Sequence, residues 1–203
     1  MQYPFLLHNA PIIDIFKVSK GKPLDWYGLR VRPNKEVPNE KCLVIQAFIY
    51  LMNKLFEIRK LSNEFYKDYP STLFPEMEHK LGRPYVVLLI RLNDLQFAIP
   101  FRTNIRHAYC YKFSTSNRPT DSDTGIDFSK AVVITKNDYL DDISDINKKE
   151  YIELESKAFF IFKQFTKYVN DYIKFKKSGG NEYVARRYRF STLKYFDDLL
   201  LKN

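Results

Sequence analysis

The pattern of apolar and polar residues changes near Met52. Before it, the stretch Gly21–Lys41 contains three prolines and has no sustained period of helix or strand, which indicates loop or disorder. A short apolar run, Cys42–Met52, then leads into a region where the patterns are regular. The sequence therefore divides into two parts, residues 1–51 and residues 52–203.

Several short segments after Met52 have the composition of β-strands. Tyr85–Leu92 is rich in branched apolar residues, Asn93-Asp94 is a turn signal, and Leu95–Phe101 has the pattern of a return strand. These segments predict an antiparallel hairpin at the centre of a sheet. Further strands are expected at Phe56–Leu61, Tyr109–Ser114, Lys130–Thr135 and Tyr188–Leu193.

Helical spacing dominates the last third of the chain. Lys148–Lys177 has apolar residues at 151, 154, 158, 161, 162, 165, 169, 172 and 173, which predicts one long helix that ends at Ser178-Gly179-Gly180. Ser62 is a candidate cap for a turn of helix around Glu64–Tyr66, and Lys194–Leu201 predicts a short closing helix. Short strands followed by a long helix predict an α+β fold, with a compact, strongly curved, mostly antiparallel sheet and flanking helices.

Composition narrows the class of protein. The chain is 45% hydrophobic and 16% aromatic, too apolar for a disordered protein, and it has neither a membrane-spanning stretch nor a convincing signal peptide. We therefore expect no membrane association. Its net charge of +9 and its 15 tyrosines favour a nucleic-acid partner, because aromatic faces stack on bases. Cys42 and Cys110 form no disulfide framework, so a reducing cytoplasm is expected.

Recognisable cofactor and metal motifs are absent from the sequence. Its three histidines are scattered, and no cysteine pair has metal-binding spacing, so we expect neither a cofactor nor a metal. Asp121, Asp123 and Asp127 superficially resemble a calcium loop, but the glycine and the glutamate of such a loop are not in place. We interpret this acidic stretch as a solvated loop.

The segment FAIPFRTNIRHAY, Phe97–Tyr109, contains the candidate chemistry. RNA cleavage without a metal needs proton transfer and stabilisation of charge on the phosphate. Arginine suits the phosphate and histidine suits proton transfer, so Arg102 and His107 are candidates, with Thr103 and Asn104 placed to orient the phosphate. Arg83 precedes the first hairpin strand and is expected beside Arg102 at the end of the second.

A structural interpretation of these residues stays open. Arg102 and Arg106 are equally explained as solvated surface charges, and His107 as a partly buried, hydrogen-bonded ring. Thr103-Asn104 is also good turn chemistry without any substrate. The aromatic residues of the long helix are expected in the core, and its lysines on the solvated face.

From Met52 onward the chain resembles the toxins of type III toxin–antitoxin systems, the ToxN/AbiQ superfamily, and it is most similar to their TenpN branch. Five matching stretches carry the resemblance, in the order and at about the spacing of the family: Asn63–Tyr69, Gly82–Ile90, Phe97–His107, Gly125–Ile134 and Tyr188–Leu200. Residues 1–51 match nothing in the family. We therefore expect them to be a non-family extension or an overcalled start, and residues 52–203 to be the toxin domain. The rival hypothesis is that Cys42–Met52 is a genuine strand or helix docked on the core.

The resemblance implies a ToxN-like fold related to MazF-like toxins, and a metal-independent endoribonuclease. Cleavage of cellular RNA would leave 2′,3′-cyclic phosphate and 5′-hydroxyl ends, and would arrest growth, often as an abortive response to phage. The implied inhibitor is a small structured RNA antitoxin, encoded as tandem repeats, which the toxin processes and which then occupies the active-site groove in a closed protein–RNA assembly. The implied location is the bacterial cytoplasm.

The family pattern assigns residues only where the motifs align. Arg83 matches the basic residue before the first hairpin strand, and Arg102-Thr103 matches the hydroxyl-bearing turn after the proline. Better-known relatives have two hydroxyl residues and then a lysine, so here the role of that lysine passes to Arg102, Arg106 or His107. The predicted catalytic set is Arg83, Arg102, Thr103 and His107. The predicted RNA contacts are Tyr85, Asn104, Arg106, Lys112, Lys130, Arg186, Arg187 and Arg189. The alternative function is a non-catalytic, basic RNA-binding domain or an inactive toxin relative.

Overall fold

The computed structural model describes residues 56–77, 85–115, 123–179 and 182–202. The extension, the run Cys42–Met52 and Arg83 lie outside the described residues. The described strands are β1 (Glu57–Leu61), β2 (Val86–Leu92), β3 (Leu95–Arg102), β4 (Cys110–Lys112), β5 (Gly125–Asp127), β6 (Val132–Ile134) and β7 (Leu140–Ile143). The helices are α3 (Asn63–Asp68), α4 (Lys148–Ser178), α5 (Glu182–Tyr188) and α6 (Asp197–Leu200), with 3-10 turns η2 (Phe128–Lys130), η3 (Asn137–Tyr139) and η4 (Thr192–Phe196).

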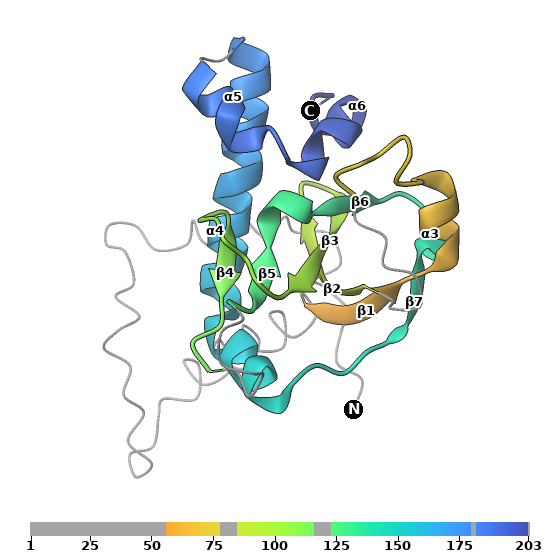
Figure 1. Ribbon diagram of the computed structural model, residues 1–203, viewed down its shortest axis with the longest axis vertical. Coiled ribbons are helices and arrows are strands. Elements are labelled where there is room, and N and C mark those ends of the chain that lie inside the picture. Colours follow the sequence, from red (N-terminus) through yellow and green to blue (C-terminus); the bar gives the residue numbers. More distant parts are fainter. Residues whose placement is uncertain (1–55, 78–84, 116–122, 180–181, 203) are drawn as a thin grey trace, which may run out of the picture. The chain divides into compact units, whose positions relative to one another are not determined.

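The described strands form one mostly antiparallel sheet in the order β4-β5-β3-β2-β1-β7, with β6 also paired to β3. The sheet curls in Figure 1 but is not closed, because β4 and β7 are its two edges. With helices flanking the sheet, the α+β prediction is confirmed. The expected hairpin lies at the centre, where β2 and β3 are neighbours.

The hairpin turn has the backbone that its residues predict. Asn93 and Asp94 have φ of 49° and 61°, the left-handed values of a type I′ turn, which Asn and Asp tolerate better than most residues. The two strands pair from Leu92↔Leu95 to Val87↔Pro100. The sheet's two faces are covered differently. Phe97 packs against Phe165 of α4 at 5.2 Å between ring centroids, whereas Ala98 borders a small cavity beside Phe65 of α3.

Two short strands, β5 and β6, pair with different parts of the same edge of β3. The candidate site lies at the gap between them. Phe101 and Arg102 pair with β5, whereas Gln96–Ala98 pair with β6. Between these two stretches the chain makes the 3-10 turn η2, so the ladder is interrupted opposite Ile99 and Pro100. A proline has no N–H to donate, and such an interruption tolerates it. Asp127 and Ser129 are placed by this interruption.

Helix α4 confirms the long helical prediction and its capping. The side chain of Asn147 accepts a hydrogen bond from the backbone N–H of Lys149 at the start, and Gly179 ends the helix in the left-handed conformation, with φ of 68°. The aromatic residues of α4 were expected in the core, and this is confirmed for Phe165, Tyr168 and Tyr172, which are at most 2% exposed. The expectation is wrong for Tyr151, Phe159 and Phe160, which are 39–49% exposed. No helix in the described part of the chain combines the length and apolar character that crossing a membrane requires.

The predicted helix cap is confirmed, two predicted strands are shorter than expected, and one predicted strand does not form. Ser62 caps α3 by accepting from the N–H of Phe65. The strands predicted at Tyr109–Ser114 and Lys130–Thr135 form only at their centres, Cys110–Lys112 and Val132–Ile134. The strand predicted at Tyr188–Leu193 does not form. Instead Tyr188 ends α5 with its ring against Tyr172 of α4, at 5.0 Å, Ser191 caps the turn η4, and Phe190 between them is left exposed.

A buried carboxylate on α4 anchors the β4 region. The side chain of Glu153 accepts hydrogen bonds from the hydroxyl of Tyr111 at 2.8 Å, from the backbone N–H groups of Ser114 and Thr115, and from both of their hydroxyls. Burial by itself raises the pKa of Glu153, but these donors outweigh it and hold the pKa at about 2. Helix α4 thereby fixes the strand that follows the candidate site.

Candidate functional site

The segment after β3 is an exposed loop pinned at one buried residue. Thr103, Asn104 and Arg106 are exposed, whereas Ile105 between them is 2% exposed and donates its backbone N–H to the carbonyl oxygen of Asp123, at 3.0 Å. Asn104 has a left-handed φ of 59°, which lets the chain reverse at this point. The loop therefore presents its polar side chains outward from a fixed base.

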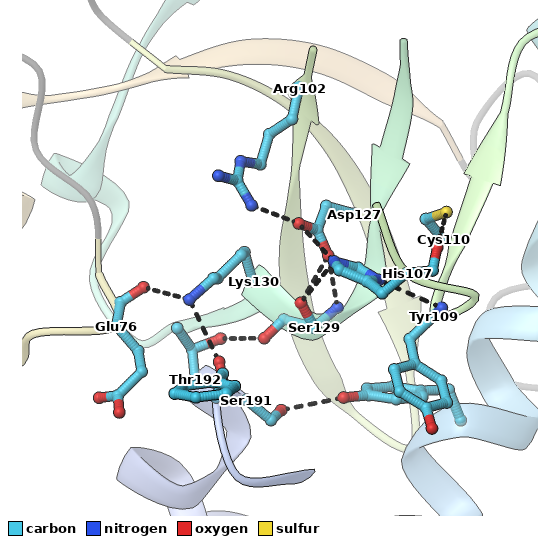
Figure 2. Close-up of polar contacts among 12 residues, drawn as sticks. Glu76, Arg102, His107, Tyr109, Cys110, Asp127, Ser129, Lys130, Ser191 and Thr192 are labelled. Carbon is cyan, nitrogen blue, oxygen red and sulfur yellow. Dashed lines mark hydrogen bonds and ion pairs between the residues drawn. The ribbon is translucent and has the colours of Figure 1, made fainter. Parts of the chain in front are cut away.

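A single buried carboxylate gathers the residues at the base of this loop (Figure 2). Arg102 Nη1 donates to Asp127 Oδ2 at 2.6 Å, and His107 Nε2 lies 3.4 Å from the same oxygen. The other oxygen, Oδ1, accepts from the hydroxyl of Ser129 at 2.6 Å and from its backbone N–H at 3.0 Å. Asp127 thus contacts two of the predicted site residues, Arg102 and His107.

Asp127 is buried but ionised, although the sequence predicted it in a solvated loop. Its side chain is fully buried, which by itself raises the pKa, but hydrogen bonds from His107, Ser129 and Arg102 reverse this and hold the pKa below its usual value. Asp127 had been expected in a solvated acidic loop together with Asp121 and Asp123. It instead ends β5, because the chain enters the sheet at Gly125 and turns back through η2. Of the other two, Asp123 is exposed, and Asp121 lies outside the described residues.

The ring of His107 is engaged through both nitrogens. Nδ1 accepts a long hydrogen bond, 3.3 Å, from the backbone N–H of Tyr109. Nε2 faces Asp127 Oδ2 and also lies 3.5 Å from the hydroxyl oxygen of Ser129. In the neutral tautomer with the proton on Nε2, Nε2–H faces Asp127 while Nδ1 accepts from the N–H of Tyr109. The side chain of His107 is 35% exposed, so solvent or a substrate can reach it.

Two further predicted residues border the same region. Tyr85, Arg102 and Lys130 line one small cavity of about 30 Å³. The ammonium of Lys130 donates to the backbone carbonyl oxygens of Glu76 at 3.1 Å and Phe190 at 3.2 Å, so it joins three segments of the chain (Figure 2). In this arrangement Lys130 holds the walls of the site together.

Other predicted RNA contacts have partners of their own. The guanidinium of Arg187 lies over the rings of Tyr109, Tyr168 and Tyr188, at 5.0–5.6 Å, and pairs with Asp171 at 3.3 Å. Lys112 pairs with Asp123, and Arg186 pairs with Glu182 one turn earlier on α5. Arg106 and Arg189 are exposed, and neither is within ion-pair distance of a carboxylate among the described residues.

The geometry thus brings Arg102 and His107 together at Asp127, and Arg102 also lines a cavity with Tyr85 and Lys130. Thr103, Asn104 and Arg106 lie on the loop that joins Arg102 to His107. Arg186 lies on α5, in an exposed ion pair of its own. The predicted Arg83 neighbour of Arg102 lies outside the described residues.

The part of the chain that the structure describes contains neither a metal-ligand cluster nor a reactive thiol at this site. Within the described ranges, no cluster of three or more His, Cys, Asp or Glu side chains is arranged to hold a metal ion. Burial, followed by the negative charge of Asp127, raises the pKa of the Cys110 thiol to about 11. A thiol held in its neutral form is a poor nucleophile. The thiol instead donates to the carbonyl oxygen of His107, at 3.2 Å, and supports the loop.

Two residues at the centre of the site were missing from the predicted set, Asp127 and Ser129. A signal for them exists in the sequence, because Asp127 and Ser129 alternate with apolar residues in GIDFSKAVVI, where polar side chains in an otherwise buried stretch need partners. Comparisons of the chain with protein-family models, with curated proteins and with solved structures found no match.

Proposed function

We propose that this protein is a metal-independent endoribonuclease of the type III toxin class, with its active site at Arg102, His107 and Asp127. One observation carries the proposal: Arg102 and His107 converge on one oxygen of a buried aspartate, at the base of an exposed polar loop. A cation and a titratable ring held together by one carboxylate are the groups that cleavage by a ribose 2′-hydroxyl requires.

Arg102 is assigned to the phosphate. Its guanidinium is planar and permanently charged, and Asp127 fixes its orientation at 2.6 Å. A group fixed in advance stabilises charge that develops on the phosphate without reorganising during the reaction. The exposed hydroxyl of Thr103, the next residue, is assigned to positioning the phosphate or the ribose.

His107 is assigned to proton transfer. With Nε2–H directed at Asp127, the lone pair of Nδ1 is the base that takes the 2′-hydroxyl proton, and Asp127 stabilises the imidazolium that forms. The 2′-oxygen bonds to phosphorus as the bond from phosphorus to the 5′-oxygen breaks, and the leaving 5′-oxygen takes a proton from water. The competing donor at Nδ1 is the N–H of Tyr109, whose bond is long at 3.3 Å. A ribose hydroxyl would have to displace this bond, and the side chain, at 35% exposed, is accessible from solvent.

The test uses the purified full chain with single-stranded RNA in EDTA. The proposal expects the RNA to be shortened, His107→Ala to lower the rate by about 100-fold or more, and Arg102→Ala to do the same, while both variants still bind RNA. Arg91→Ala, a matched removal of an exposed arginine on β2, is expected to leave the rate unchanged. Failure of the wild-type chain to shorten any RNA would contradict the proposal.

The alternative, a non-catalytic RNA-binding domain, is favoured by one specific observation. Both ring nitrogens of His107 already have partners within the protein, and Arg102 is ion-paired, as expected of a purely structural cluster. In that case the wild-type chain binds RNA but does not shorten it. The assay above separates the two functions.

The proposed partner is a small structured RNA, encoded as tandem repeats, that the toxin processes and that then inhibits it in a closed protein–RNA assembly. The exposed arginines beside the site and the net charge of +9 support a polyanionic partner. The proposed location is the bacterial cytoplasm, and the proposed role is growth arrest in defence against phage. Co-expression with such an RNA is expected to relieve growth arrest, and to fail to do so when the RNA repeat is scrambled.

A further inference from the structure

Phe190 is a large aromatic side chain that the fold leaves in solvent. It is 62% exposed, although it lies between Tyr188, at 4% exposed, and Ser191, at 1%. Among the described residues it packs against no other aromatic ring, and only the guanidinium of Arg189 lies over its face, at 5.2 Å. Burial does not explain why an aromatic residue stands at this position.

The backbone around Phe190 is held tightly, so the exposure is not that of a loose loop. Lys130 Nζ donates to the carbonyl oxygen of Phe190 at 3.2 Å, and the N–H of Ser191 donates to the carbonyl oxygen of Tyr188 at 3.0 Å. Two residues later, the hydroxyl of Thr192 donates to the carbonyl oxygens of Ala131 and Ser129, at 2.5 and 3.2 Å. The ring therefore projects from a fixed support.

This support belongs to the wall of the proposed active site. The Ser129 that receives the bond from Thr192 also donates its hydroxyl to Asp127 Oδ1, at 2.6 Å. Lys130, which holds the carbonyl group of Phe190, lines the same small cavity as Arg102. Figure 2 shows Thr192 and Lys130 on one side of Ser129, with Asp127 and His107 on the other. A ligand that contacts Arg102 is therefore close to the segment that carries Phe190.

The charge around Phe190 favours a nucleic acid over an apolar protein partner. Arg189, whose guanidinium lies over the ring at 5.2 Å, is an exposed cation next to it, and Arg186 on the preceding turn is exposed but paired with Glu182. An open aromatic face beside cations is the combination that single-stranded nucleic acids use, because bases stack on the ring while phosphates pair with arginine.

We propose that Phe190 is a stacking platform for an unpaired base of the RNA, next to the nucleotide held at Arg102. This inference rests on the proposed function. It adds that the RNA substrate must be single-stranded where it passes Phe190. Arg189 then contacts the same nucleotide, either over the ring or at its phosphate.

The test is a binding measurement with the full chain and a short 2′-fluoro single-stranded RNA, which lacks the hydroxyl needed for cleavage. Phe190→Leu is expected to weaken binding by about 5- to 100-fold, whereas Phe190→Trp keeps the affinity, since stacking needs only an aromatic face. Tyr151→Leu removes another exposed aromatic ring, on the first turn of α4, and serves as the matched control. The same variants are then measured with an abasic oligomer of equal length.

The outcomes separate the platform from the function on which it rests. Stacking predicts that the loss in Phe190→Leu disappears with the abasic oligomer, because no base remains to stack. An equal loss with both oligomers, or no loss with either, overturns the platform, while cleavage by the wild-type chain leaves the proposed function standing. If the wild-type chain binds no RNA at all, both proposals fall. In addition, the fluorescence of Phe190→Trp should be quenched by RNA, measured against the wild-type chain, whose one tryptophan is Trp26.

Discussion

Arg102 and Asp127 form an ion pair in which the carboxylate is fully buried and the guanidinium is 21% exposed, with Nη1 and Oδ2 2.6 Å apart. They lie on neighbouring strands, Arg102 at the end of β3 and Asp127 at the end of β5, so the pairing of these strands sets the distance. A buried charge is stable only when its partners are in place. The pair is therefore part of the fold as well as of the proposed site.

Asp127→Ala is expected to lower the free energy of unfolding by about 3–5 kcal/mol, because it removes the common partner of Arg102, His107 and Ser129. Urea unfolding measures the change. Asp123→Ala, which breaks the exposed pair with Lys112, is the control and should cost no more than about 1 kcal/mol. Similar small losses for both variants would mean that the cluster around Asp127 contributes little to the fold.

Gly125→Ala is expected to disrupt β5 at the edge of the site. A Cβ atom on Gly125 would lie 2.0 Å from the backbone oxygen of Tyr111, so β4 and β5 would have to separate. We expect a loss of about 2 kcal/mol or more in the free energy of unfolding, together with loss of RNA cleavage. Gly179→Ala is the comparison: its Cβ meets open space, and its φ of 68° alone costs about 1 kcal/mol. Equal effects of the two substitutions would contradict the predicted clash.

Glu153 is expected to make stability depend on pH in the acid range. Its pKa is about 2 in the folded chain and 4.5 when unperturbed, so the unfolded chain takes up the proton first as the pH falls. Its contribution is thus complete above about pH 4.5 and is lost as the pH falls toward 2. Glu153→Gln should lose about 1.5–3 kcal/mol at neutral pH and show a flatter acid limb in urea unfolding at a series of pH values. Glu155→Gln, an exposed change on the same helix, should match the wild type. A Glu153→Gln curve parallel to that of the wild type would refute this role.

RNA affinity is expected to fall steeply with salt, because each phosphate contact releases counterions. Arg106→Ala should reduce the slope of log K against log salt by about 0.7, the value for one phosphate of a single strand. Arg91→Ala, on β2, should leave the slope unchanged. A nearly flat dependence for the wild-type chain would indicate that the basic excess serves another purpose.

The parts of the fold that depend on local pattern could be predicted from the sequence. The Asn93-Asp94 turn, the cap at Ser62 and the period of α4 are each decided by residues close together in the chain. The strand predicted at Tyr188–Leu193 was wrong because the alternation of Tyr188 and Phe190 does not reflect a shared buried face. Tyr188 ends α5 against Tyr168 and Tyr172 of α4, whereas Phe190 is exposed.

The candidate site could be predicted only in part. Arg102 and His107 were identifiable from their chemistry beside Pro100, but their common partner was not, because Asp127 becomes their neighbour through the pairing of β3 with β5. Local composition assigned Asp127 to a solvated acidic stretch, whereas η2 and the strand pairing bury it. Tertiary packing likewise places Arg187 over Tyr109, Tyr168 and Tyr188, a contact between distant segments that local composition does not indicate. Its predicted RNA contact stays a prediction.

The most direct test of the central claim is the chemistry of the RNA ends that the full chain leaves in EDTA. Attack by the 2′-hydroxyl, with His107 moving the proton and Arg102 holding the phosphate, predicts a 2′,3′-cyclic phosphate on one product and a 5′-hydroxyl on the other. The 5′ end should then accept a label from a polynucleotide kinase without prior phosphatase treatment, and a single 2′-deoxy substitution at the cut position should abolish cleavage there. Products with 5′-phosphate ends, cleavage that needs a divalent metal, or undiminished cutting at the 2′-deoxy position would contradict the account.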